Sequence, residues 1–164
     1  MADGRGVGWV MGAGAGLALV GLVFPPLLEL TGASALASLV VGLATGATLG
    51  TSPSGMRILD AARQLEGGWK DAVVVSVMAG ATAAVLVLLS ARVPRLGRLF
   101  AYAGLAAVGA IELAPRIQKA DARGWLASLV AQSDPGVGYY VALAGFGIAI
   151  LAGTLGGLAR TGPK

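Results

Sequence analysis

The chain has 164 residues, of which 56% are hydrophobic and 12% are charged, and its formal net charge is +4. Soluble domains carry about 25% charged residues, so this composition excludes an ordinary water-soluble domain and favours a membrane protein. Cysteine and histidine are absent, which removes most ligands for haem, iron–sulfur clusters, zinc and copper, and we expect no cofactor. In so apolar a chain the basic excess indicates contact with anionic lipid headgroups rather than with nucleic acid.

Uncharged runs along the chain are long enough to cross a membrane. A spanning helix needs about 20 apolar residues, and the runs predict five spans, at about residues 7–28, 31–51, 72–91, 98–114 and 137–159. Aromatic residues near the ends of most of these runs support the boundaries, because Trp and Tyr rings favour the headgroup level. No span has the charged face of a helix in a water-soluble bundle. The predicted fold class is therefore all-α, a polytopic membrane helix bundle formed by residues 1–164 as one domain.

The connections between these spans alternate between short and long. The short links that begin at Phe24 and at Arg92 predict two antiparallel hairpins, one made by the first and second spans and one by the third and fourth. The fifth span would pack onto both. Five spans that alternate in direction also place the first and third helices parallel to each other.

The two long links predict amphipathic helices that lie in the plane of the membrane interface. The segment Pro53–Glu66 follows a serine cap, precedes a Gly-Gly stop and gathers Ile58, Leu59 and Leu65 on one face. A shorter segment of the same kind, around residues 124–130, ends at a predicted turn, Asp134-Pro135-Gly136.

The orientation in the membrane depends on where lysine and arginine lie. The raw count of these residues favours an N-terminus on the inside. The loop that contains Arg92, Arg95 and Arg98, however, is short and dense in charge, and such loops resist translocation. We therefore expect this loop inside and, with five spans, the N-terminus outside.

Small residues recur every four positions in several spans. At this spacing they line one side of a helix and let a neighbouring backbone approach closely, which gains dispersion contacts and weak Cα hydrogen bonds. The predicted helix-packing interface consists of Gly8, Gly12, Gly16, Gly42, Gly46, Gly50, Gly145, Gly153 and Gly157. These stripes either pack the helices of the chain itself or, for at least one of them, face another subunit, and both interpretations stay open here.

Two acidic residues follow long apolar runs. Glu29 lies about 36 Å of helix after Arg5, which would carry it to the far interface, whereas Glu112 lies only about 21 Å after Arg98 and would sit inside the hydrocarbon core. An intramembrane carboxylate suggests ion or proton handling. Alternatively, Glu112 pairs with Arg116 one turn later near an interface, where Pro115 would end the helix.

The sequence contains no arrangement typical of an enzyme, such as a Ser/His/Asp set or a phosphate-binding glycine loop followed by lysine. We expect a non-catalytic integral membrane subunit, in a prokaryotic cell membrane, that packs through its small-residue stripes in a homo-oligomer or a larger membrane complex. Its partners would be lipids and other membrane subunits or copies of itself. The alternative is a small ion or proton transporter or channel that uses Glu112, with Arg116 and Glu29 as further candidates.

Overall fold

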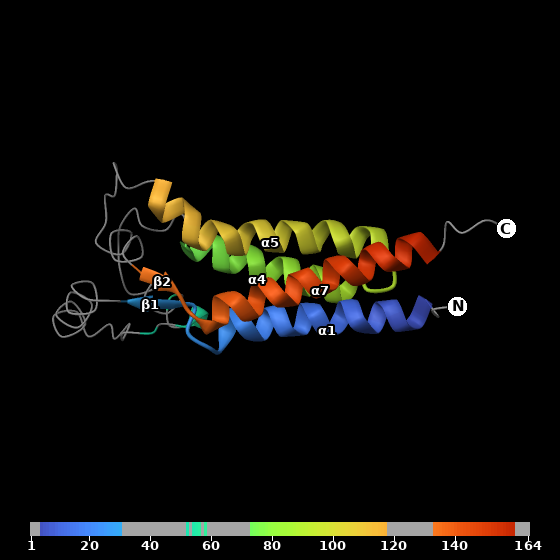
Figure 1. Cartoon of the computed structure of the whole chain (residues 1–164), viewed down its shortest axis with the longest axis horizontal. Helices are drawn as coiled ribbons and strands as arrows, with labels where there is room; N and C mark the ends of the chain where they lie inside the picture. Colours follow the sequence, from blue (N-terminus) through green and yellow to red (C-terminus); the bar gives the residue numbers. More distant parts are fainter. Residues whose placement is uncertain are drawn as a thin grey trace.

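The structure is a computed structural model that describes residues 4–30, 52, 54–56, 58, 73–117 and 133–159, with the backbone alone at residues 4, 5, 30, 114–117, 133 and 159. Its helices and strands are α1 (Gly4–Val23), β1 (Leu28–Leu30), α4 (Val73–Leu89), α5 (Pro94–Ile117), β2 (Ser133–Pro135) and α7 (Val137–Ala159) (Figure 1). The predicted span at 31–51 and the predicted interfacial segment around 124–130 lie outside the described residues. The described part of the chain is thus a helical bundle with one small antiparallel sheet.

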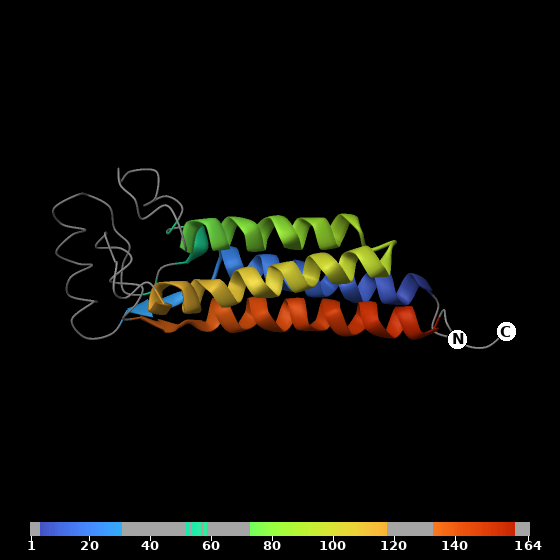
Figure 2. The same cartoon turned by 90° about the horizontal axis from the view of Figure 1, so that it is seen from above.

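The helices lie side by side and alternate in direction, as in an up-and-down four-helix bundle (Figures 1 and 2). Helix α1 packs against α4 and α7, and α5 packs against the same two helices from the opposite corner. The start of α1, the turn between α4 and α5 and the end of α7 lie together, and we call this the terminal end of the bundle. The sheet of β1 and β2 lies at the other end, which we call the strand end.

The buried positions of the helices repeat at alternating intervals of three and four residues. On α4 they are Val73, Ser76, Val77, Gly80, Ala83, Ala84 and Val87. On α5 the same intervals connect the buried Pro94, Gly97, Ala101, Gly104, Val108 and Ile111. An average interval of 3.5 residues keeps one seam of each helix facing its neighbours, and it is the period of left-handed helical bundles. This period, rather than a four-residue one, describes the core.

The first helix ends at Val23, before the predicted limit near residue 28. Pro25 and Pro26 lack the N–H groups that would continue the helix, so the chain leaves it here. The carbonyl oxygen of Pro26 instead accepts a hydrogen bond from the Gly138 N–H at 2.7 Å, and that of Leu27 accepts one from the Gly136 N–H at 2.9 Å. These bonds attach the start of α7 to the turn after α1. The bond to Pro26 satisfies the Gly138 N–H, which lies in the first turn of α7 and has no partner within that helix.

The predicted turn at residues 134–136 is wrong, because Ser133–Pro135 forms strand β2. It pairs antiparallel with β1 so that Leu28 is opposite Pro135 and Glu29 is opposite Asp134. Directly opposite residues in such a pair project from the same face, and both acidic side chains are exposed. The sheet therefore holds two like charges beside each other.

Replacing Asp134 by lysine is expected to raise the free energy of unfolding by about 0.2–1 kcal/mol, since it converts a like-charge cross-strand pair into an opposite-charge one. Thermal unfolding in detergent, followed by circular dichroism, measures the change. The same substitution in a Glu29→Gln background removes the charge partner and should lose the gain. An equal gain in both backgrounds would mean that the pairing of these two residues is not its cause.

The predicted hairpin of the third and fourth spans is confirmed, since α4 packs against α5 through a short turn. Pro94 begins α5, a position that tolerates proline because its N–H would have no partner in the helix. The helix continues through Pro115 to Ile117, so the prediction that Pro115 ends it is wrong by two residues. So close to the C-terminal end, the proline removes a single backbone hydrogen bond and leaves the last residues in helical conformation.

The direction of α4 relative to α1 differs from the prediction. The start of α1 lies at the end of α4, where a Cβ added at Gly8 would be 2.9 Å from the carbonyl oxygen of Ala91. Further down, a Cβ added at Gly80 would be 3.1 Å from Cδ1 of Leu22, which is near the end of α1. The two helices are therefore antiparallel, whereas five alternating spans would make them parallel.

Candidate functional site

The closest approach of two helices lies along the seam between α1 and α7. A Cβ added at Gly14 would be 2.7 Å from the Gly145 carbonyl oxygen and 2.9 Å from the Ala149 nitrogen. A Cβ added at Gly21 would be 2.6 Å from the Ala142 nitrogen. Real Cβ atoms do not approach backbone atoms so closely, so glycine is required at these positions. The seam is held by the many small dispersion contacts that direct backbone approach allows.

The glycines of this seam are seven residues apart. Gly14 and Gly21 on α1 face Gly138 and Gly145 on α7, and each pair spans two helical turns of a left-handed bundle. The four-residue stripes predicted from the sequence include Gly145 but neither Gly14 nor Gly21. A search for glycines at intervals of seven would have found both.

The predicted stripe on α1 turns away from the core. Gly8 faces the carbonyl group of Ala91. Among the described atoms, Gly12 has only Cδ2 of Leu88 within 4 Å of an added Cβ, at 3.9 Å, and Gly16 has none. Each step of four residues advances about 40° around a helix, so Gly16 lies about 80° from Gly8. The stripe therefore passes from the contact with α4 to the outer surface.

The predicted stripe on α7 turns in the same way. A Cβ added at Gly145 would be 2.6 Å from the Gly14 carbonyl oxygen on α1. At Gly153 it would be 3.3 Å from the Pro94 carbonyl oxygen on α5, and at Gly157 it would meet no described atom within 4 Å. Three further members of the predicted interface lie outside the described residues: Gly42, Gly46 and Gly50.

The predicted acidic site lies at the strand end of the bundle. Glu112 is half-buried and lines an open pocket of about 480 Å³ together with Gly109, Leu113 and Tyr139. Tyr139 belongs to the first turn of α7, and Glu112 is about 27 Å along α5 from Pro94, so it lies near one end of the helix rather than at its middle.

The predicted acidic site has two further residues, Glu29 and Arg116. Glu29 is on β1 and does not line the pocket of Glu112. Arg116 belongs to α5, and its side chain is outside the description. The described residues therefore bring Glu112 together with Tyr139 rather than with a second carboxylate.

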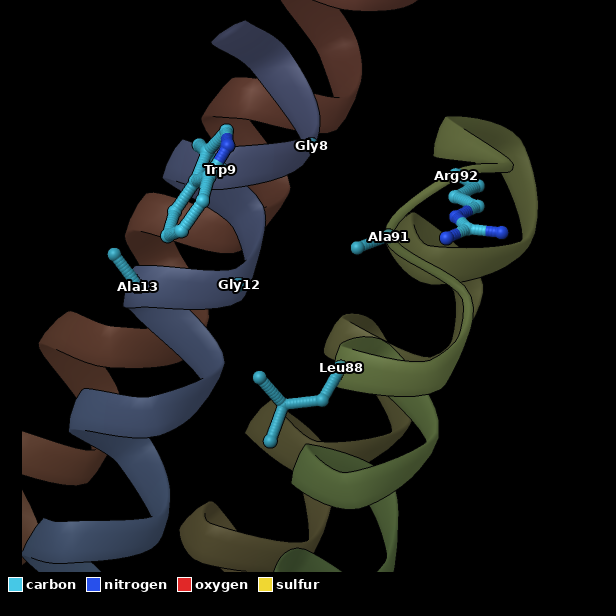
Figure 3. A pocket seen from close by; sticks show the side chains of 7 residues that line it. All are labelled: Gly8, Trp9, Gly12, Ala13, Leu88, Ala91 and Arg92. Atoms are coloured by element: carbon cyan, nitrogen blue, oxygen red, sulfur yellow. The ribbon is translucent and has the colours of Figure 1, made fainter. Parts of the chain in front are cut away.

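A larger groove lies between α1 and α4 at the terminal end (Figure 3). Its volume is about 720 Å³, and its lining consists of Gly8, Trp9, Gly12, Ala13, Leu88, Ala91 and Arg92. The first four residues come from α1 and the last three from the end of α4 and the turn that follows it. The antiparallel packing of α1 on α4 brings Trp9 and Arg92 to the lining of the same groove.

Charge is divided between the two ends of the bundle. Among the described side chains, the charged residues at the terminal end are Arg92, Arg95 and Arg98. Those at the strand end are Glu29, Glu112 and Asp134. The described part of the bundle is thus positive at one end and negative at the other.

The described residues include no group of three or more His, Cys, Asp or Glu side chains that could hold a metal ion. In comparisons with known proteins, no family model, curated protein or solved structure matches the chain.

Proposed function

We propose that this chain is a non-catalytic integral membrane protein of a prokaryotic cell membrane, and that it associates with copies of itself or with other membrane subunits through small residues on the outer surface of its bundle. Two sets of observations support the proposal. One concerns the outer surface of the helices, and the other concerns glycines that the packing of the described helices does not require.

The outer surface of the bundle is apolar. Among the described helices, three are long and apolar enough to cross a membrane, and only 28–39% of the residues in these segments are buried in the bundle: Gly6–Val23, Pro94–Leu113 and Val137–Leu158. Much of the remainder consists of large apolar side chains, such as Leu151, Leu155 and Leu158, each 65% exposed. Exposed apolar surface costs about 25 cal/mol per Å² in water, and lipid removes this cost.

The observation that carries the association is the open space at Gly16 and Gly157. Both belong to predicted stripes, and an added Cβ at either would meet no atom of the described residues within 4 Å. Glycine in a helix costs about 1 kcal/mol relative to alanine, so the bundle by itself would be more stable with a larger residue at these positions. Close contact with the backbone of another helix would require glycine at both.

Leucine at Gly16 or at Gly157 is therefore expected to leave the bundle folded and to dissociate the assembly, because the side chain would hold the partner helix away. Native mass spectrometry from lipid nanodiscs measures the oligomeric state, and circular dichroism measures the fold. Gly147→Leu is the matched control, since Gly147 is also open but lies off the predicted stripe. A wild-type protein that is already monomeric in lipid would contradict the proposal.

An ion or proton transporter that uses Glu112 is the second candidate. The open pocket of about 480 Å³ beside this residue favours it. The position of Glu112 near the strand end gives it less support, because a carboxylate close to the membrane surface can be hydrated and need not carry ions across the membrane.

A further inference from the structure

The groove between α1 and α4 is apolar along its length and basic at its rim. Gly8 and Gly12 expose the backbone of α1 on one side of it, and Leu88 extends toward α1 from the other (Figure 3). Apart from Arg92, every lining residue is apolar. The volume of about 720 Å³ falls within the range of roughly 300–1,000 Å³ typical of sites for small organic molecules.

The groove opens at a level where a lipid headgroup would lie. Trp9 lies beside the part of the groove near the start of α1 and is 81% exposed, and Trp side chains favour the headgroup region. Arg92 stands on the exposed turn at the same end of the groove, and a guanidinium group can donate two parallel hydrogen bonds to a phosphate. Arg92 is the one charged residue in the lining of the groove. The rim is therefore complementary to an anionic headgroup.

The shape of the groove suits a flexible chain better than a second helix. The part of α1 that lines it, from Gly8 to Ala13, is about 8 Å long. Below Gly12 the side chain of Leu88 reaches from α4 toward α1 and limits the groove (Figure 3). A packed helix would need an apolar contact several turns long, whereas the first part of an acyl chain fits this length and can then bend outward into the bilayer.

We propose that this groove binds one anionic phospholipid, with its phosphate beside Arg92 and the upper part of one acyl chain against Gly8 and Gly12. The inference rests on the proposed membrane location of the bundle, but it does not depend on association with another subunit. The bound lipid would fill the space between the start of α1 and the end of α4, which the described residues leave open at the terminal end.

Native mass spectrometry of the protein, purified in mild detergent with phosphatidylglycerol or with phosphatidylcholine of the same acyl chains, tests the proposal. The wild type should retain one phosphatidylglycerol and little phosphatidylcholine. Gly12→Leu should abolish this retention, because its side chain would occupy the groove. It should remain folded, since an added Cβ would contact only Leu88, at 3.9 Å.

Arg92→Gln, on the exposed turn, should weaken the retention of phosphatidylglycerol about fivefold, the effect of one basic residue near an anionic lipid surface. Arg95→Gln is its control, because Arg95 does not line the groove. This variant should retain most of the bound lipid. Gly147→Leu is the control for Gly12→Leu. Gly16→Leu should retain the lipid whether this variant is monomeric or oligomeric. That result would separate lipid binding from subunit association.

Equal retention of the two lipids by the wild type, or undiminished retention by Gly12→Leu, would overturn the proposal. Displacement of the lipid by inorganic phosphate would overturn it as well, because a site built for the acyl chain should not release it to a free anion. Carbonate extraction of membranes tests the membrane location separately. A protein that stays in extracted membranes but fails the lipid test leaves the proposed function intact and removes only the lipid site.

Discussion

Leucine in place of Gly145 is expected to lower the free energy of unfolding by about 3 kcal/mol or more, because the seam between α1 and α7 has no space for a side chain. The added Cβ alone would be 2.6 Å from the Gly14 carbonyl oxygen and 2.8 Å from the Ala18 Cα. Since these are backbone atoms, no rotamer change can relieve the clash. The two helices would have to separate and lose dispersion contacts along the whole seam.

Denaturation in mixed detergent micelles, followed by circular dichroism, measures this loss. Gly147→Leu makes the same chemical change two residues further along α7, where an added Cβ meets nothing within 4 Å, and should unfold close to wild type. Similar losses for the two variants would show that the cost comes from leucine in α7 generally, and would contradict the close seam described above.

Single cysteines at Gly6 and at Arg92 are expected to react from the same side of the membrane, because the start of α1 and the turn after α4 both lie at the terminal end. Cysteines at Glu29 and Asp134 should react only from the opposite side, since both residues lie on the sheet. A membrane-impermeant maleimide on sealed vesicles of known orientation gives an all-or-none result.

We also expect a particular side of the membrane for each end of the bundle. The arginine-rich turn should remain in the cytoplasm, and because α1 starts at the same end, the N-terminus should be cytoplasmic too. This reverses the orientation expected from five spans. A cysteine at Ala83, which is buried in the bundle, should react from neither side. Labelling of Gly6→Cys and Arg92→Cys from opposite sides would restore the five-span topology.

The existence of the described helices could be predicted from the sequence, because each follows from an uncharged run. The prediction for α7, residues 137–159, matches the helix in the structure, and α4 differs by one or two residues at each end. The predicted boundaries differ more from the observed ones in the two helices that have proline near an end. Proline ends α1 early but lies inside the last turn of α5, and the sequence around it does not distinguish the two outcomes.

The faces of the helices were harder to predict, since glycine occurs at several spacings at once. On α1 the four-residue interval connects Gly8, Gly12 and Gly16, whereas the seven-residue interval connects Gly14 and Gly21. Both patterns are consistent with close helix packing. Only the second follows the period of this bundle, and the choice depends on the crossing geometry of a neighbour that the sequence of one helix does not contain.

The groove could not be predicted for a related reason. Aromatic residues and the arginine-rich loop were each expected at a membrane boundary, but Trp9 and Arg92 are far apart in the chain. They lie beside the same groove because α1 and α4 are antiparallel neighbours. The prediction made these helices parallel, which would have placed the two residues on opposite sides of the membrane.

The seam between α1 and α7 joins the first and last helices of the described chain, and this has a consequence for biosynthesis. Ribosomes add about 5–20 residues per second, so α7 emerges roughly 6–23 s after α1 is complete. During this interval the glycine face of α1 has no partner from its own chain. The insertion machinery or the surrounding lipid must hold the nascent helix in place until translation is nearly finished. In a chain that stops before residue 137, α1 would remain in the membrane without the helix that it packs against.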